Sequence, residues 1–370
     1  MQFKILRTEL LNALSKVTKA VSSKSPLPAL SGIKFEVTNE HLILTGSDSD
    51  ITIQTTILTK ENILEVINEG SVVLSARFIS EIIRKIDSEF VVFDMLDGSL
   101  TKIKGDNSEF NLNGIKAIDY PKIDLSKTGE HFSINSVILK NVIDQTIFAT
   151  SDKEARPVLT GVNFKSNNST IECIATDSYR LAKKIIEIDD NLAFNITIPG
   201  KSLNEISKII EKDETINIYI TDRKILFVFD NVFIQTRLID GTFPDTSRLI
   251  PTDFSYELRI DSREFMGAID RASLLSSESA NIVKLIMSED HILLTSSSQE
   301  IGSVEEHLTA AIFTGVPLTI SFSAKYLTDA IRSIGSNYMS ILFTGEMKPF
   351  VIKNKEDESN VQLVLPVRTY

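Results

Sequence analysis

The sequence predicts an α+β protein made of three repeated domains, each with about two helices packed on antiparallel sheets. Three observations support this prediction. The 370-residue chain can be superimposed on itself at shifts of 123 to 129 residues, which is the size of a whole domain and far longer than a solenoid repeat. Each repeat has two segments with apolar residues at helical spacing. Short β-branched runs, separated by Asn, Asp, Gly and Ser, occupy the rest of each repeat.

The repeats match over several separate segments. A shift of 129 residues places Gly32 on Gly161 and Asp48 on Asp177 without a gap. A shift of 124 residues places VVLSARFISEII on ITIPGKSLNEIS, and a second such shift places it on LTISFSAKYLTDAI. The basic residues that coincide in this superposition are Arg77, Lys201 and Lys325.

The repeat also gives domain boundaries. A Tyr-Pro pair at 120–121 and a Phe-Pro pair at 243–244 end the first two units at equivalent places. No Gly/Ser-rich linker follows either pair, so we expect the domains to dock rigidly. The expected domains are 1–125, 126–252 and 253–370.

Six helices are expected, two in each repeat, at 8–20, 76–86, 135–148, 201–212, 261–275 and 324–334. Asn135 or Ser136 can cap the third helix, and Asp261 and Ser262 can cap the fifth. The helix residues expected to face the core are Leu10, Leu14, Val17, Val21, Ile138, Val142, Ile143, Phe265, Ile269 and Ala272.

Composition points to a soluble protein of a reducing compartment. The only cysteine is Cys173, which excludes an intrachain disulfide and favours a buried, small apolar role. The N-terminus lacks the apolar core of a signal peptide, and no apolar run approaches the ~18 residues of a membrane span. We therefore expect a cytoplasmic protein without a membrane partner.

The formal charge is −11, which on its face disfavours a nucleic-acid binder. The charges are sorted, however. The six expected helices hold 13 Lys/Arg and 9 Asp/Glu, a net of +4, and the remainder carries a net of −15. If the helices line one surface, that surface attracts a polyanion. The alternative is that these charged helix faces are simply solvated.

No enzymatic or metal-binding pattern is present. The phosphate-binding loop, the dinucleotide fingerprint, HExxH, CxxC and GxSxG are absent, and the four histidines lie far apart. Asp48 and Asp177 recur at one repeat position, but equivalent residues lie in different domains, so turn formation is favoured over paired catalysis. We expect no catalytic residue, metal or cofactor.

Five segments, RPVLTGV, ATDSYRLA, IPGKSLNE, IDGTFPD and the terminal LVLPVR, are similar in order and spacing to the bacterial DNA polymerase III beta subunit family, the sliding clamps. The resemblance covers the whole chain. It implies three DNA-clamp domains and a head-to-tail homodimer that closes a six-domain ring. In the cytoplasm, at the nucleoid, such a ring encircles duplex DNA in a topological, sequence-independent way during DNA replication. It serves as a non-enzymatic processivity factor that tethers the replicative polymerase.

The resemblance also implies a pocket for short linear motifs of the polymerase catalytic subunit, the clamp loader, repair polymerases and mismatch-repair proteins. Its apolar walls would take Leu and Phe side chains, with Arg at the rim to fix the peptide backbone. Ser178-Tyr179 stand where relatives often have Gly-His. The expected pocket residues are Leu159, Thr176, Arg180, Leu181, Pro244, Arg248, Leu249, Met347, Pro349, Val364, Leu365, Pro366, Val367 and Arg368. Deleting Val364–Tyr370 is expected to abolish partner binding and leave the dimer intact.

Two further sets of residues follow from the resemblance. The expected DNA contacts are Lys24 and Lys153 in loops, with Arg77, Lys201 and Lys325 at helix starts. The expected dimer seam contains Phe110, Leu112, Leu274, Leu275, Glu300, Glu305 and Glu306. Asn107 and Glu109 stand where basic residues can occur, which leaves Lys102 and Lys104 nearby. We therefore expect an apolar seam with little sensitivity to salt.

Two other classes of function remain as alternatives. A repeat-built hydrolase could use Asp177 and Asp245, but no His, Cys or metal set accompanies them. A monomeric adhesion or scaffold protein would need flexible linkers and a secretion signal, and the sequence has neither.

Overall fold

The structure is a computed structural model that describes residues 1–370 except 23, 26, 154, 277–280, 369 and 370. The described residues form six α-helices and 26 strands. Their contacts divide the chain into two compact units, Met1–Val137 with Asn204–Leu238 and Ile138–Leu203 with Ile239–Tyr370. These units differ from the three expected domains, whose limits therefore stay a prediction. None of the helices in the described part of the chain is both long and apolar enough to cross a membrane.

The first unit holds two helices and the strands around them. Its elements are β1 (Gln2–Leu6), α1 (Arg7–Val17), β2 (Gly32–Val37), β3 (His41–Ser47), β4 (Ile51–Leu58), β5 (Leu64–Asn68), β6 (Gly70–Ser75), α2 (Ala76–Lys85), β7 (Phe90–Asp97), β8 (Leu100–Lys104), β9 (Glu109–Asn113), β10 (Ile115–Lys116), β11 (Glu130–Asn135), β15 (Thr215–Ile220), β16 (Lys224–Phe229) and β17 (Val232–Arg237).

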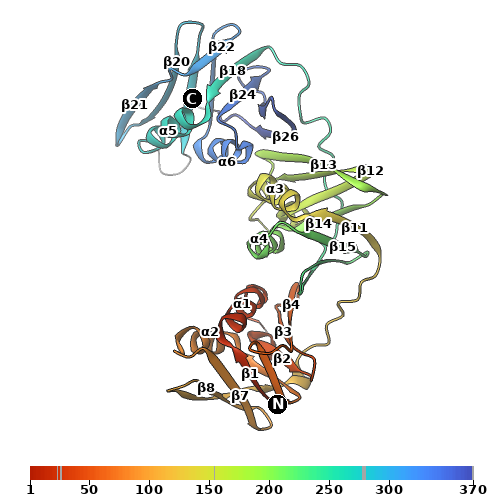
Figure 1. Ribbon diagram of the computed structural model, residues 1–370. Coiled ribbons are helices and arrows are strands. Elements are labelled where there is room, and N and C mark those ends of the chain that lie inside the picture. Colours follow the sequence, from red (N-terminus) through yellow and green to blue (C-terminus); the bar gives the residue numbers. More distant parts are fainter. Residues whose placement is uncertain (23, 26, 154, 277–280, 369–370) are drawn as a thin grey trace. The chain divides into compact units, whose positions relative to one another are not determined.

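The strands of the first unit make two antiparallel sheets. One has the order β5-β1-β7-β8-β9, and the other has the order β10-β6-β2-β3-β4-β17-β16-β15-β11. Helices α1 and α2 lie side by side, and α1 contacts strands of both sheets (Figure 1). The larger sheet joins strands of two repeats, because Ile51 of β4 is paired with Thr236 of β17.

The second unit repeats this plan. Its elements are α3 (Ser136–Thr146, from residue 138), β12 (Gly161–Thr176), β13 (Arg180–Leu192), β14 (Asn195–Pro199), α4 (Gly200–Ile209, to residue 203), β18 (Tyr256–Asp261), α5 (Ser262–Ser273), β19 (Ile282–Met287), β20 (Ile292–Ser298), β21 (Gly302–His307), β22 (Ala311–Thr314), β23 (Leu318–Ser323), α6 (Ala324–Ile334), β24 (Tyr338–Phe343), β25 (Phe350–Asn354) and β26 (Asp357–Val364).

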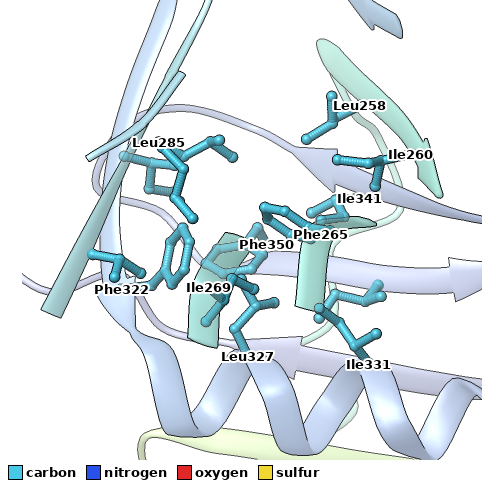
Figure 2. Packing of buried hydrophobic residues seen from close by; sticks show 14 of the residues in the cluster. Leu258, Ile260, Phe265, Ile269, Leu285, Phe322, Leu327, Ile331, Ile341 and Phe350 are labelled. Carbon is cyan, nitrogen blue, oxygen red and sulfur yellow. The ribbon is translucent and has the colours of Figure 1, made fainter. Parts of the chain in front are cut away.

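Eight strands of the second unit form a sheet in the order β14-β12-β13-β26-β25-β24-β18-β22, and four form a sheet in the order β21-β20-β19-β23. Helices α5 and α6 pack side by side over these strands. Figure 2 shows the apolar core between them, where Phe265 and Ile269 of α5 meet Leu327 of α6 and Phe350 of β25. Each such buried side chain contributes about 1.5–3 kcal/mol.

The six expected helices are present. α6 has the expected bounds, whereas α1 and α4 begin one residue earlier and end three residues earlier than expected, and the others differ by one or two residues at one or both ends. Helix α3 begins with Asn135 Oδ1 accepting a hydrogen bond from the Val137 amide (2.9 Å). Helix α5 is capped by Asp261, whose side chain accepts from the amides of residues 263 and 264. Two inward residues were predicted wrongly. Ile138 is 41% exposed, and Val21 is half-buried and lies beyond the end of the helix. Helical spacing predicts which residues share the apolar face of a helix, but it does not tell which of them lie at the margin of that face. Ile138 lies at the margin and faces solvent, whereas Val142 is buried.

Glu257 on β18 is predicted to add pH-dependent stability. It accepts hydrogen bonds from Arg259 Nε (2.9 Å) and from Ser340 Oγ (2.8 Å). The bond with Arg259 lowers the pKa of Glu257 to about 2. Because the pKa is lower in the folded chain, the stabilisation is complete above the unfolded value of about 4.3 and is lost as pH falls toward 2. We expect Glu257→Gln to cost about 1 kcal/mol at neutral pH.

Thermal unfolding of the two proteins at several pH values checks this prediction. The difference in melting temperature should shrink below about pH 4.3. A difference that stays constant from pH 7 to pH 2.5 would contradict the role assigned to the Glu257 charge.

Candidate functional sites

The C-terminal tail is fixed against the second unit by its backbone. After β26, the amide of Leu365 donates to the carbonyl of Tyr179 (2.9 Å), and the amide of Val367 donates to the carbonyl of Ser321 (2.8 Å). A chain end normally frays, so these bonds mark a built surface. The tail is therefore held on the second unit at the place where the expected pocket would lie.

The remaining expected pocket residues also lie in the second unit. Leu181 packs in an apolar cluster with Leu363 and Val351, and Leu365 and Phe243 lie against this cluster. The buried members of the expected pocket are Leu159, Thr176, Arg180, Leu181 and Val364, the half-buried members are Pro349, Leu365, Pro366 and Val367, and the exposed members are Pro244, Arg248, Leu249, Met347 and Arg368.

Two exposed apolar side chains project from this part of the unit. Leu249 and Met347 are each 51% exposed. Val364, by contrast, belongs to the third-repeat core and is fully buried. A deletion that starts at Val364 would therefore damage the core as well as remove the tail.

Arg180 does not lie at the rim. Its side chain is 8% exposed. Its Nε donates to Asp177 Oδ2 (3.0 Å), and its Nη1 donates to Asp329 Oδ2 (2.7 Å). Arg180 was expected at the pocket rim, where it would bind the peptide backbone. This expectation is wrong for Arg180, because its guanidinium is buried and bonded to two carboxylates. Arg248 and Arg368 are the exposed arginines of the expected set.

The recurring aspartates make turns, as expected. Asp48 Oδ1 accepts from the amides of residues 50 and 51 (3.0 and 2.9 Å), and Asp177 Oδ1 accepts from the amides of residues 179 and 180 (2.9 and 3.0 Å). The following residues, Ser49 and Ser178, have φ values of 86° and 78°. Equivalent turns thus begin β4 and β13, and the prediction of a structural role is confirmed.

The five basic residues expected to contact DNA are all exposed. Arg77, Lys201 and Lys325 occupy the second position of α2, α4 and α6. Lys24 and Lys153 lie in the loops that precede the short turns at 28–31 and 157–160. Counted over the observed helices, 12 basic and 7 acidic residues give a net of +5. The sorting of charge predicted from the sequence is therefore confirmed.

Four of the seven expected seam residues lie on sheet edges. β9 carries Phe110 and Leu112, both half-buried, and it ends the five-stranded sheet of the first unit. β21 ends the four-stranded sheet of the second unit and carries Glu305 and Glu306. Leu274, at the end of α5, is 74% exposed, Leu275 is half-buried and Glu300 is exposed.

The basic side chains near both edges are paired with carboxylates of the same chain. Glu109 binds Lys102 (2.9 Å) and Lys104 (3.5 Å), and the hydrogen bond with Lys102 lowers the pKa of Glu109. Arg271 binds Glu306 through two hydrogen bonds (2.9 and 2.7 Å), which lower the pKa of that carboxyl. Both carboxylates are therefore ionised and already neutralised at neutral pH.

The described residues hold no group of three His, Cys, Asp or Glu that could bind a metal ion. Cys173 is fully buried, and burial raises the pKa of its thiol well above the usual range. It lies in β12 as a small core residue, as predicted.

Comparison with known proteins settles the family. The profiles of the N-terminal, central and C-terminal domains of the DNA polymerase III beta subunit match residues 1–124, 133–245 and 247–368. The chain belongs to the DNA polymerase III beta subunit family. The beta sliding clamps of Bacillus subtilis and Staphylococcus aureus are 43% and 41% identical, with all of each chain covered. The prediction of three clamp domains is confirmed.

Solved structures agree. The B. subtilis sliding clamp has a TM-score of 0.96 at 43% identity, and the Streptococcus pyogenes beta subunit has a TM-score of 0.94 at 34% identity. Both comparisons cover all of each chain. As a member of the beta subunit family, the chain is a non-catalytic processivity subunit.

Sequence reasoning missed three residues around Arg180 of this beta subunit. They are Phe148, Tyr326 and Asp329, which contact Arg180 from distant parts of the sequence. Asp329 is 149 positions from Arg180. No local sequence signal connects them, since the contact arises only when β13 and α6 are brought together.

Proposed function

We propose that two copies of this chain close a head-to-tail ring that encircles duplex DNA, slides along it and tethers the replicative polymerase. The observation that carries this proposal is the match of three consecutive clamp domains along the whole chain. The net positive helices support it. A ring holds DNA by topology, so a chain with a net charge of −11 needs only loose phosphate contacts, which permit sliding.

The domain limits proposed are 1–125, 126–252 and 253–370, and the place of action proposed is the cytoplasmic nucleoid. The three matched clamp domains support these domain limits. A ring on replicating DNA would act at the nucleoid.

We infer that the tail, the 239–250 segment and the start of β13 form a groove for short linear motifs. Apolar positions such as Leu249, Met347 and Val367 would take Leu and Phe side chains of the motif. Arg248 and Arg368, which are exposed, would bind its backbone carbonyls or flanking acids. The partners proposed are the polymerase catalytic subunit, the clamp loader, repair polymerases and mismatch-repair proteins.

The dimer seam is proposed between β9 of one copy and β21 of the other. Both are sheet edges within their units, and an exposed edge offers unpaired backbone groups to another strand. Phe110 and Leu112 would supply apolar contact with Leu274 and Leu275 of the second copy.

Loading onto DNA is expected to weaken when Lys24 and Lys153 are both changed to Ala. Each exposed lysine that contacts a phosphate contributes to the salt dependence of binding, so the slope of log K against log salt should fall by about 2. Loading by the clamp loader, followed at several salt concentrations, measures this effect.

A matched control changes Lys60 and Lys122 to Ala, since these lysines are also exposed but lie outside the two loops. Equal effects of both double variants would identify Lys24 and Lys153 as ordinary surface charges.

The proposed function is tested by retention on nicked circular duplex DNA before and after linearisation. A topological ring stays on circles and leaves linear DNA through its ends. The same DNA with both ends blocked by a bound protein is the control, and it should retain the ring. If the protein stays on the DNA equally well after linearisation, it binds by direct contact, and the ring mechanism would have to be withdrawn.

A further inference from the structure

The buried arginine beside the groove is held by four side chains, which we call the Arg180 clasp: Asp177, Asp329, Phe148 and Tyr326. Asp177 and Asp329 bind its guanidinium at 3.0 and 2.7 Å. The ring centroids of Phe148 and Tyr326 lie 5.3 and 4.6 Å from its Cζ. Cations at this distance from a ring face are attracted to it. The guanidinium therefore contacts charged and aromatic groups together.

The clasp joins separate elements. Arg180 is the first residue of β13, Phe148 lies in the short turn after α3, and Tyr326 and Asp329 lie on α6. Tyr326 also stacks on Tyr179, with ring centroids 6.3 Å apart and planes at 24°. One arginine thus fastens helix α6 to the turn that begins β13.

The surface beside the clasp is hollowed and lined mostly by polar residues. A cavity of about 310 Å³ lies beside the clasp, and its wall includes Phe148, Asp329, Gln145 and Ser333. This hollow is open to solvent, so no described side chain packs against its lining from that side. The apolar core holds the inner face of α6, whereas its link to the turn at residues 177–180 is made by the contacts of Arg180.

The clasp is connected to the groove wall by short steps. The side chain of Thr176 donates to the Arg180 carbonyl (2.6 Å). Arg180 is paired with Val364 across β13 and β26. The carbonyl of Tyr179 accepts the amide of Leu365 (2.9 Å). The tail thus leaves the sheet at the residues that the clasp fixes.

We propose that Asp329 is a positioning residue for motif binding, which acts through Arg180 to hold the turn at 177–180 and the tail in their binding geometry. This inference rests on the proposed groove. Arg180 itself supports the wall and does not read the charge of the motif, because its guanidinium already binds two carboxylates. When the contacts that support a binding site are lost, the residues that touch the ligand remain, but they are no longer held in the geometry that binding needs.

The test uses a fluorescein-labelled decapeptide that ends in Leu-Phe, with binding measured by anisotropy on the full-length protein. Asp329→Asn removes the charge and nearly keeps the shape, and we expect the Kd to rise about tenfold. Asp329→Glu keeps the charge and should stay within about threefold of the original chain.

The matched control is Asp357→Asn. Asp357 on β26 forms an ion pair with Lys184 of β13 (2.7 Å). This pair also joins an acidic residue to a basic residue of β13, but it lies away from the tail. Its loss should leave the Kd within about twofold. The melting temperatures of all variants separate a change in the groove from a general loss of folding.

Two further readouts distinguish positioning from direct contact. The loss caused by Asp329→Asn should be the same for peptides with and without an acidic residue before Leu-Phe, and it should not change with salt. A loss confined to the acidic peptide would show that Arg180 reads charge directly, which overturns the positioning role. Unchanged affinity in a folded Asp329→Asn protein would also overturn it.

The failure of the groove itself would look different. If the unaltered protein does not bind the peptide, or binds it equally after removal of residues 366–370, the proposed motif groove fails and the inference fails with it. If the unaltered protein binds and the shortened one does not, only the Asp329 variants decide the inference.

Discussion

Removing residues 366–370 is expected to weaken binding of the Leu-Phe decapeptide by a factor of about 30 to 1,000 while the chain stays folded. The deletion takes away the bond from the Val367 amide to the Ser321 carbonyl (2.8 Å). It also removes the half-buried Pro366 and the exposed Arg368. Truncation of a central wall of a binding site costs about 2–4 kcal/mol or more, which corresponds to a factor of about 30 to 1,000.

The point at which the deletion begins decides how the result is read. Val364 is fully buried in the core and is paired with both Arg180 and Phe350. A deletion from Val364 removes this side chain and should lower stability by about 2 kcal/mol or more. A deletion from 366 leaves it in place. The original expectation for residues 364–370 therefore combined two effects.

Anisotropy with the decapeptide, sedimentation and thermal unfolding together check this prediction. The shortened chain should lose peptide binding, keep its dimer and keep its melting temperature within a few degrees. Arg368→Ala, which removes one exposed side chain, is the matched control and should cost much less. A shortened chain that binds the peptide normally would show that the tail is not a wall of the groove.

Much of the fold could be predicted because its causes are local or repeated. The helices follow from apolar spacing, and their positions agree among repeats, so that Arg77, Lys201 and Lys325 all stand second in a helix. The turns at Asp48 and Asp177 follow from side-chain bonds to amides two and three residues away. Such features depend on neighbours in the sequence.

The parts that could not be predicted depend on distant neighbours. Arg180 resembles a rim arginine until Asp329, 149 residues away, is placed beside it. Ile138 has the spacing of a core residue, but its exposure depends on what covers the start of α3. The pairing of Glu109 with Lys104 lies between these cases, because the two residues face each other across the β8–β9 hairpin. A hairpin prediction with the correct register could have found it.

The dimer is expected to dissociate when Phe110 and Leu112 are both changed to Asp. These half-buried side chains lie on edge strand β9, where the proposed seam would bury them further. Placing a carboxylate in such an interface costs about 2–3 kcal/mol or more for each residue. The dissociation constant should therefore rise by about 1,000-fold or more. Leu58→Asp, at an apolar position that is 68% exposed, is the matched control and should leave the dimer intact.

The same seam should respond little to salt. Intermolecular ion pairs would weaken as salt screens them. Here Glu109 already binds Lys102, and Arg271 already binds Glu306. Lys102, Lys104 and Arg271 are thus engaged within the chain, so few cations are left to pair with Glu300 and Glu305 across the seam. Sedimentation at 0.1 M and 0.5 M NaCl should give dissociation constants within about threefold of each other. A steep rise with salt would mean that the intrachain pairs exchange for intermolecular ones when the ring closes, and the apolar seam would then be wrong.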